Sequence, residues 1–295
     1  MENLSNTSDL IFRELNSHDV EQMHHAFNDA FCDYKLFMRF SRESFVDKFI
    51  KRLNLNFNLS FGAFHNDQLV GFALFSTGKY ENKNTLYNGG TGVIPAFRGM
   101  RITFTIFQEV LKKAANMGID QIVLEVLTDN KTAINTYESI GFCKSKYLHC
   151  FKLNPDNLRL IENPGYELTV TEPEYSDVIE SMDELSTSFL DTHHTINASR
   201  DRFLMIKASK ETQLHGYIIF SPKTGRINRL AIDKNNRGNY IGTYLINEAF
   251  RLSEKKNLTF MNIHQRYYGF INFLLAIGFR NEVDQYELQL PLLRY

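Results

Sequence analysis

A tyrosine and a glutamate stand where their side chains could take part in group transfer. Tyr137 lies four residues after Ala133 in a helical pattern, so the two side chains share one face of that helix. A phenol so placed can donate a proton to a leaving group, although a tyrosine that packs in the core has the same pattern. Glu125 interrupts an apolar strand, which suits a general base or a structural hydrogen bond equally well. Both residues are candidates for catalysis.

Glycines interrupt the strand expected over residues 84–94, which ends at Pro95. Glycines inside a strand mark a bulge or a close approach to the backbone, and they are Gly89, Gly90 and Gly92. Such a strand can part from its neighbour and leave backbone N–H and C=O groups for an extended ligand. A bulged edge strand without a ligand explains the pattern as well.

The loop after this strand enters a helix near Ile102. A helix N-terminus carries free N–H groups and a partial positive charge, which suit a phosphate or pyrophosphate. Arg98 and Arg101 add full charges beside it. The loop is therefore a candidate phosphate site, although a solvated helix start with two surface arginines has the same pattern.

Together these features resemble the GNAT superfamily of N-acetyltransferases. The resemblance rests on Val93 to Gly99, Asn130, Ala133, Tyr137 and Gly141-Phe142, and it covers nearly all of residues 10–153. It implies that the loop cradles the pyrophosphate of acetyl-CoA, with Asn130 near the pantetheine arm and Tyr137 near the sulfur. The acetyl-CoA contacts it implies are Gly92, Val93, Ile94, Arg98, Gly99, Met100, Arg101, Ile102, Thr103, Asn130 and Ala133.

Two of these positions leave questions open. Arg101 and Thr103 stand where the family has small residues, so they either crowd the phosphate or, for Arg101, add a charged contact. Asn130 is also a favoured N-cap residue, and a capping side chain is already occupied.

Acetyl transfer to an amine needs a polarised carbonyl, a base and an acid, and it needs no metal. The resemblance implies that an N–H near Val93 polarises the carbonyl. Tyr137 is the expected acid, and Glu125 or a water-relayed base accepts the proton of the ammonium. His193 and His194 are adjacent and rarely chelate a metal together, so no metal site is expected.

The acceptor is expected to meet residues 30–40. Asp33 can attract an ammonium and Tyr34 adds an apolar wall, together with Phe37, Met38 and Phe40. An aromatic cluster of this kind is more often part of the core.

The composition excludes several classes of protein. The 295 residues carry 33 Lys+Arg and 34 Asp+Glu, a net charge of −1, which argues against a nucleic-acid partner. No apolar stretch approaches a membrane span, and the polar start does not resemble a signal peptide. Three cysteines without paired spacing fit a reducing compartment, so a cytoplasmic protein is expected. The sequence is compatible with a homodimer.

The chain repeats itself once. Arg98-Gly99 returns as Arg237-Gly238 after 139 residues, and Gly141-Phe142 returns as Gly278-Phe279 after 137 residues. Such a long period indicates a duplicated domain. We therefore expect a domain over 1–153, a linker over 154–165 and a second domain over 166–295.

The first half predicts an α/β fold of the α+β type. Strands are expected over 10–15, 59–65, 69–80, 84–94, 121–127 and 142–153, and helices over 18–31, 41–53, 102–117 and 130–140. The prediction is two tandem GNAT-like domains, each a mixed, mostly antiparallel sheet flanked by helices.

The second half predicts strands over 167–170, 215–221 and 226–233 and a helix over 172–189. Tyr267, Phe270 and Leu274 stand at the positions of Asn130, Ala133 and Tyr137. We expect the aromatic bulk of Tyr267 and Phe270 to fill the pantetheine slot, and Leu274 to have replaced the proton donor. The second domain is then degenerate, and it has a structural role or shapes the acceptor site. Arg98, and not Arg237, is then expected to face a phosphate.

The leading hypothesis is an N-acetyltransferase. It would move an acetyl group directly from acetyl-CoA to a primary amine of a small molecule or peptide, in a ternary complex. A non-catalytic acyl-CoA sensor and a tRNA-dependent aminoacyl transferase of tandem GNAT type are the alternatives. Tyr137 and Asn130 favour the enzyme over the sensor, and the near-neutral charge counts against tRNA.

Overall fold

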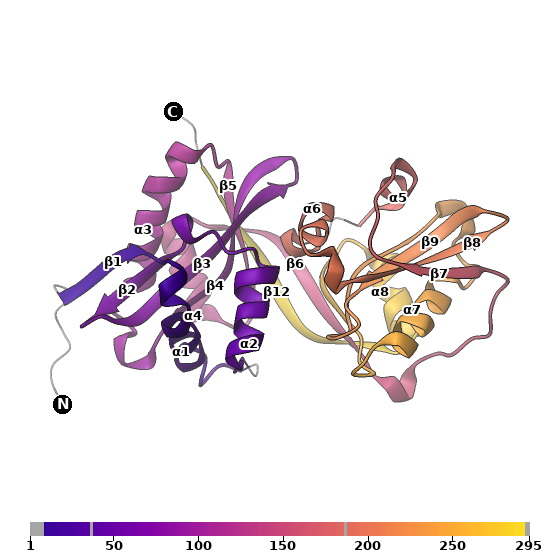
Figure 1. Cartoon of the computed structure of the whole chain (residues 1–295), viewed down its shortest axis with the longest axis horizontal. Helices are drawn as coiled ribbons and strands as arrows, with labels where there is room; N and C mark the ends of the chain where they lie inside the picture. The colour runs from indigo at the N-terminus through magenta and orange to yellow at the C-terminus, as the bar shows by residue number, and fades with distance from the viewer. Residues whose placement is uncertain (1–8, 36–37, 186–187, 293–295) are drawn as a thin grey trace. The chain divides into compact units, whose positions relative to one another are not determined.

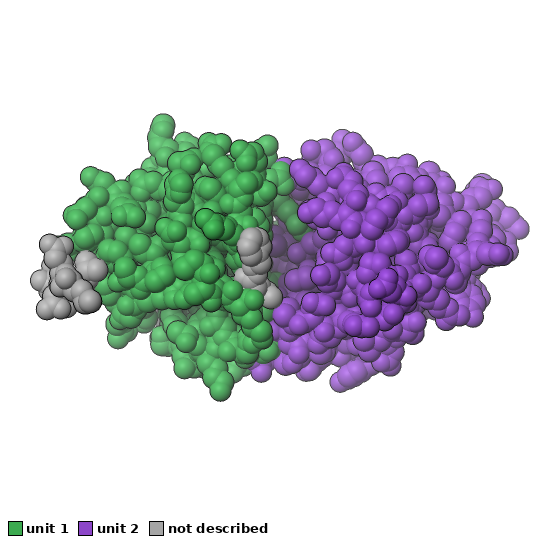
Figure 2. Space-filling model, turned by 90° about the horizontal axis from the view of Figure 1, so that it is seen from below, with its two compact units in different colours: residues 1–145, 288–295 green, residues 146–287 purple. Residues whose placement is uncertain are grey.

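The computed structural model describes residues 9–35, 38–185 and 188–292 (Figure 1). It divides the chain into two compact units, coloured separately in Figure 2. Unit 1 holds residues 1–145 and 288–295, and unit 2 holds residues 146–287. The segment 154–165, expected as a linker, thus lies inside unit 2. Both boundaries between the units fall inside strands. The sequence does not predict these boundaries, because turn-forming residues cluster elsewhere, in the segment 154–165.

Unit 1 has the element order expected for the first half. Its elements are β1 (Leu10–Glu14), α1 (Val20–Ala30), α2 (Arg42–Phe45), a π-helical turn (Val46–Arg52), β2 (Phe61–His65), β3 (Gln68–Tyr80), β4 (Lys83–Val93), α3 (Ile102–Ala114), β5 (Gln121–Leu127) and α4 (Lys131–Ile140). Strands β1 to β4 form an antiparallel meander, and β5 runs parallel to β4.

Two glycines let helices approach the two faces of this sheet. A Cβ on Gly92 would lie 2.8 Å from Cβ of Ala30, the last residue of α1. A Cβ on Gly71 would lie 2.6 Å from the side chain of Ile102, the first residue of α3. Cross-strand partners share a face, and Gly92 pairs with Phe72 whereas Gly71 pairs with Val93. Helices α1 and α3 therefore cover opposite faces.

Unit 2 repeats this plan. Its elements are β6 (Cys143–Leu153), which begins in unit 1, then β7 (Glu167–Thr171), α5 (Asp177–Met182), α6 (His193–Asn197), β8 (Leu204–Lys210), β9 (Gln213–Phe220), β10 (Arg226–Ile232), α7 (Ile241–Leu252), β11 (Thr259–His264), α8 (Tyr268–Ala276) and β12 (Phe279–Pro291), which ends in unit 1. Strands β7 to β10 are antiparallel, and β11 runs parallel to β10. The predicted fold class and duplication are confirmed.

The helix expected over 172–189 is mostly wrong. Only Asp177–Met182 is helical before the undescribed residues 186–187. Ser176 caps the start, and Asp183 turns to extended backbone at the end. The Asp183 carboxylate accepts a hydrogen bond from Tyr217 at 2.5 Å and lies 3.1 Å from the Arg229 guanidinium. These contacts with strands β9 and β10 compete with continuation of the helix.

Two hydrophobic clusters in unit 2 mark its two faces. Ile218, Phe220 and Leu230 pack with α7 and α8, whereas Tyr217 and Ile219 pack with Ile179 of α5 and Ile196 of α6. Figure 1 shows α7 and α8 together beside the strands. Across the described parts of the chain, no helix combines the length and apolar character that crossing a membrane requires.

Candidate active site and a second cavity

Strands β4 and β5 separate part of the way along β4. The parallel pairing runs only from Thr85 with Gln121 to Tyr87 with Val123. Strand β4 stays paired with β3 as far as Val93, with an irregular register around Gly89. Within the described residues, β4 has no pairing with β5 from residue 88 to residue 93, so that edge of the strand faces a gap between the two strands.

The backbone at the end of β4 points an N–H group into this gap. The Ile94 N–H donates to the Val70 carbonyl of β3 at 3.0 Å. Adjacent residues of a strand direct their N–H groups to opposite sides, so the Val93 N–H points away from β3. Val93 is thus placed where the sequence expects a donor to a thioester carbonyl.

The predicted phosphate loop leads from this strand into α3. Gly99 has φ 82°, and a Cβ added there would meet nothing within 4 Å, so the backbone is open. Arg101 caps the helix in the left-handed conformation with φ 56°, and its guanidinium lies 4.5 Å above the Phe104 ring. The side chain of Ile102 is buried, which leaves its N–H as the group available to a ligand. Met100 precedes the cap residue and Thr103 follows Ile102, and both residues are partly exposed.

Arg98 forms an ion pair with Asp33. Its two terminal nitrogens donate to the carboxylate at 2.6 and 2.8 Å, and one also donates to the Ala30 carbonyl at 2.9 Å. Its Nε donates to the Val93 carbonyl at 3.3 Å. The Arg98 hydrogen bonds hold the pKa of Asp33 below its usual value. Two residues predicted for different ligands therefore bind each other, and their roles toward phosphate and ammonium stay predictions.

Helix α4 brings Tyr137 to the separated part of β4. The Tyr137 ring packs edge-to-face on Phe107 and Phe142, with centroids 5.8 and 5.6 Å apart. Its hydroxyl shares a hydrogen bond with the side chain of Thr91 in β4, and burial raises the pKa of Tyr137 to about 12. The phenol is therefore neutral at physiological pH and next to the gap.

Asn130 is the N-cap of α4, because its Oδ1 accepts the Ala133 N–H at 3.1 Å. The Asn130 side chain also hydrogen-bonds the Tyr34 hydroxyl, while burial of Tyr34 raises the pKa of that phenol. The next residue, Lys35, pairs with Asp129. Residues 33–35 thus contact the Arg98 loop and the start of α4 together.

Glu125 lies on β5, two residues beyond the last pair with β4. Its carboxylate accepts a hydrogen bond from the Tyr87 hydroxyl at 2.5 Å. The structural alternative for this glutamate is thus observed, and its role as base stays a prediction.

Part of the expected acceptor wall belongs to the core. Phe40 packs edge-to-face on Phe27 and Phe49, with centroids 5.6 and 6.0 Å apart. Met38 is partly exposed, and Phe37 lies outside the described residues.

One of the two adjacent histidines contacts a carboxylate: His193 forms a hydrogen bond with Asp183. A group that the sequence did not suggest is Glu21, His24 and His25 on α1, whose ligand atoms lie within 4.8 Å of one another. Arg42 donates to Glu21 at 2.7 Å, so a cation already balances this carboxylate.

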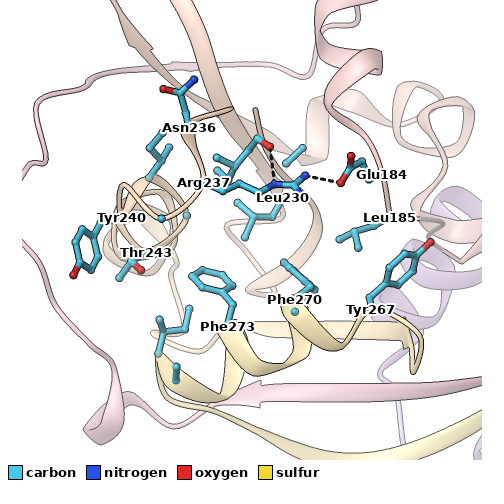
Figure 3. Close-up of a pocket in the computed structure, with 18 of the residues that line it drawn as sticks. Glu184, Leu185, Leu230, Asn236, Arg237, Tyr240, Thr243, Tyr267, Phe270 and Phe273 are labelled. Atoms are coloured by element: carbon cyan, nitrogen blue, oxygen red, sulfur yellow. Dashed lines mark hydrogen bonds and ion pairs between the residues drawn. The ribbon is translucent and has the colours of Figure 1, made fainter. Parts of the chain in front are cut away.

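In unit 2, Arg237 repeats the contacts of Arg98. Its Nε donates to the Ile232 carbonyl at 3.4 Å, five residues before it, and its terminal nitrogen donates to Glu184 at 2.6 Å (Figure 3). Tyr240 matches Arg101 in the left-handed conformation with φ 60°. The expected difference between the two arginines is therefore absent from their contacts.

A cavity of about 700 Å³ lies between the end of β10, α7 and α8. Tyr267 and Phe270 line it, whereas Leu274 is fully buried in the core. The expectation that Tyr267 and Phe270 fill the slot is wrong, because their rings form walls around an open space.

Comparison with known proteins supports the sequence resemblance. Residues 20–142 match the model of the acetyltransferase (GNAT) family. The chain is 34% identical over 109 residues to N-alpha-acetyltransferase 30 of Schizosaccharomyces pombe, which covers 36% of this chain and 72% of that protein. It is 30% identical over 96 residues to thialysine N-epsilon-acetyltransferase of Bos taurus, covering 31% of this chain and 56% of that protein.

Solved structures share the fold over the whole length. A putative acetyltransferase from Pyrococcus horikoshii has a TM-score of 0.71 at 18% identity, covering 100% of this chain and 93% of that one. A tandem GNAT protein from the clavulanic acid biosynthesis pathway also has a TM-score of 0.71, at 14% identity, covering 96% of this chain and 98% of that one. With the family match in unit 1 and the relative from Schizosaccharomyces pombe, they lead to one conclusion: the chain belongs to the GNAT family of acetyltransferases.

Proposed function

We propose that unit 1 transfers an acetyl group from acetyl-CoA to a primary amine of a small molecule or peptide, directly and in a ternary complex. The observation that carries this proposal is the buried Tyr137 hydroxyl beside Thr91, where β4 has parted from β5. The residues of this site fall within the stretch that matches the family, 20–142.

The chain offers two sets of groups to acetyl-CoA. The N–H groups from Gly99 to Thr103 lie at the start of α3 and suit the pyrophosphate. The Val93 N–H faces the gap and suits the thioester oxygen, where it stabilises the charge of the tetrahedral intermediate. The Arg98 and Asp33 pair fixes the loop between these two sets.

The acid step follows from the pKa of Tyr137. An amine attacks the thioester carbon, and collapse of the intermediate breaks the carbon–sulfur bond. A thiol has an ordinary pKa of about 8.5, well below the value of about 12 for Tyr137. Tyr137 therefore stabilises the departing thiolate chiefly by donating a hydrogen bond. The amine must attack in its neutral form, so Glu125 or a water molecule first takes one proton from the ammonium. The second proton leaves the amine nitrogen to solvent as the carbon–sulfur bond breaks, which gives the neutral amide and the thiolate.

Two relatives support an amine acceptor. Their names specify an α-amino and an ε-amino group as the acetylated position. The second name also specifies thialysine, which favours a small amine as one acceptor to test.

The test is a screen for CoA-thiol release. The full chain with acetyl-CoA would be offered free amino acids, small diamines and short peptides with free N-termini. We expect at least one amine class to raise thiol release well above hydrolysis, with the acetylated product visible by mass spectrometry. Background release with every amine, despite measurable acetyl-CoA binding, would favour the acyl-CoA sensor.

A further inference from the structure

A bulge in β4 brings two polar side chains to one face of the sheet. Asn88 pairs with Phe75 of β3 and Thr91 pairs with Ala73, and the register shifts between these pairs, around Gly89. Cross-strand partners share a face, and Phe75 and Ala73 lie two residues apart on one strand. Asn88 and Thr91 therefore point to the same side, whereas a regular strand would direct residues three apart to opposite sides.

Thr91 stands in the middle of a chain of hydrogen bonds on this face. Its hydroxyl donates to Oδ1 of Asn88 at 2.9 Å, and Nδ2 of Asn88 donates to the Leu74 carbonyl at 3.3 Å. The Asn88 side chain is buried. A hydroxyl has one proton to donate, so Thr91 in this arrangement accepts the hydrogen bond that it shares with Tyr137. The phenol proton of Tyr137 is thus held toward β4.

The phenol proton has a stronger acceptor once a thiolate forms beside it. A charge-assisted hydrogen bond is roughly twice as strong as a neutral one, so the Tyr137 O–H turns from Thr91 to the sulfur. The Thr91 proton can then turn from Asn88 to the phenol oxygen, and the number of hydrogen bonds in the chain stays the same. Hydrogen bonds in a chain polarise one another, so a donor to the phenol oxygen makes Tyr137 a better donor in turn.

We propose that Thr91 is a positioning residue for Tyr137: it accepts from the phenol before transfer and donates to the phenol oxygen while Tyr137 donates to the departing thiolate. Asn88 fixes the Thr91 side chain through the hydrogen bond that the bulge permits. No covalent bond forms or breaks in this step, because only hydrogen bonds change direction. The inference rests on the function proposed for unit 1.

Unit 2 lacks both members of the pair. Leu230 stands 139 residues after Thr91, the spacing that relates Arg98 to Arg237, and Leu274 stands at the position of Tyr137. Neither leucine can donate or accept a hydrogen bond through its side chain. The hydroxyl of Thr91 and that of Tyr137 are thus absent together where the expected leaving-group donor is missing.

The test measures how strongly the full chain binds the thiolate of coenzyme A, which is the leaving group itself and requires no amine. Titration calorimetry would compare coenzyme A with desulfo-coenzyme A, in which hydrogen replaces the thiol, at pH 7 and pH 9.5. A thiol with an ordinary pKa of about 8.5 is mostly ionised at the higher pH, where Tyr137 is still neutral. We expect the preference of the wild type for coenzyme A to rise about fivefold or more between the two pH values.

Variants separate positioning from structure. Thr91→Val and Thr91→Ala remove the hydroxyl and should reduce this rise to about twofold or less, whereas Thr91→Ser keeps the hydroxyl and should retain most of it. Tyr137→Phe should lose the rise, and adding Thr91→Val to it should change nothing further, because Thr91 acts through Tyr137. Thr77→Val, at a partly exposed position of β3, is the matched control.

The outcomes distinguish this inference from the function on which it rests. A rise lost in Tyr137→Phe but kept in Thr91→Val would overturn the role of Thr91 and leave that of Tyr137. Equal weakening of both ligands at both pH values by Thr91→Val would show a structural role alone, which also overturns the inference. If the preference of the wild type does not change with pH, Tyr137 does not stabilise the thiolate, and the role of Thr91 is refuted with it.

Discussion

An arginine in each unit fixes the loop before a helix through the same kind of contacts. Arg98 joins the Val93 carbonyl to Asp33, and Arg237 joins the Ile232 carbonyl to Glu184. The hydrogen bonds of Arg98 use four of its five N–H groups, which leaves few donors for a phosphate. We infer that this arginine positions the loop while the backbone N–H groups bind the anion.

This inference predicts matched losses. Arg98→Ala and Asp33→Asn should each weaken acetyl-CoA binding by a similar factor, up to about fivefold, as expected for an exposed ion pair. A direct phosphate contact predicts otherwise: Arg98→Ala would lose about 10- to 100-fold, and Asp33→Asn would lose nothing. Calorimetry on both variants separates the two roles. Arg42→Ala, which breaks the exposed pair with Glu21, is the matched control.

The raised pKa of Tyr137 predicts a loss of stability at alkaline pH. An unfolded tyrosine ionises near pH 10, whereas the buried Tyr137 stays neutral until about pH 12. Its contribution is complete below pH 10 and is lost as the pH rises through this window, by about 1.4 kcal/mol at pH 11. Urea unfolding at pH 8.5 and pH 11 should show a smaller fall for Tyr137→Phe than for the wild type. Equal falls would mean that Tyr137 is not protected from ionisation.

At the scale of elements, the caps set where the helices position their side chains. Gly118 and Gly141 follow α3 and α4 with φ 67° and 114°, a conformation that glycine adopts readily, as expected at a helix end. Asn130 begins α4 and so sets the position of Tyr137 two turns later. The two roles that the sequence leaves open for Asn130 can be separated by substitution.

Asn130→Ala should lower the free energy of unfolding by about 1 kcal/mol, because it removes the cap of α4. Asn130→Ser keeps a capping oxygen and should restore most of that stability. If the amide also contacts pantetheine, the serine variant will bind acetyl-CoA more weakly than the wild type while unfolding at the same urea concentration. Equal destabilisation by alanine and serine would show that the cap contributes little.

At the scale of the molecule, the end of the chain completes the sheet of unit 1. Residues 288–295 belong to that unit, where Leu288 is fully buried and the Leu292 N–H donates to the Asp120 carbonyl at 2.9 Å. An isolated fragment 1–153 would therefore lack a strand of its own sheet.

Removing residues 288–295 should expose the edge of β5. Hydrogen exchange of residues 121–127 should accelerate, whereas β9 in unit 2 should keep its protection. Leu288→Ala is the milder change and should cost unit 1 about 2–5 kcal/mol, the usual range for a buried leucine. Faster exchange in β9 with no change in β5 would contradict this assignment of the C-terminal strand.

The sequence predicts local structure better than long-range contacts. Apolar periodicity predicts helices α3 and α4 and strands β3 to β5, and the glycine after each helix predicts where that helix ends. The pair of Arg98 with Asp33, 65 residues apart, has no signal in periodicity. Neither has the passage of β12 from unit 2 to unit 1, because its apolar pattern does not specify a partner strand. The cavity of unit 2 has no signal in the sequence either, because the size of Tyr267 and Phe270 does not specify the direction in which each ring points.

The central claim is that unit 1 performs acetyl transfer and that Tyr137 stabilises its leaving group. Turnover of acetyl-CoA with the best amine of the screen tests it most directly, in Tyr137→Phe and in Leu274→Met, a change of similar volume at the matched position of unit 2. We expect Tyr137→Phe to lower kcat about 10²-fold with acetyl-CoA binding nearly unchanged, and Leu274→Met to match the wild type. Turnover of Tyr137→Phe within twofold of the wild type, or a loss confined to Leu274→Met, would contradict the claim.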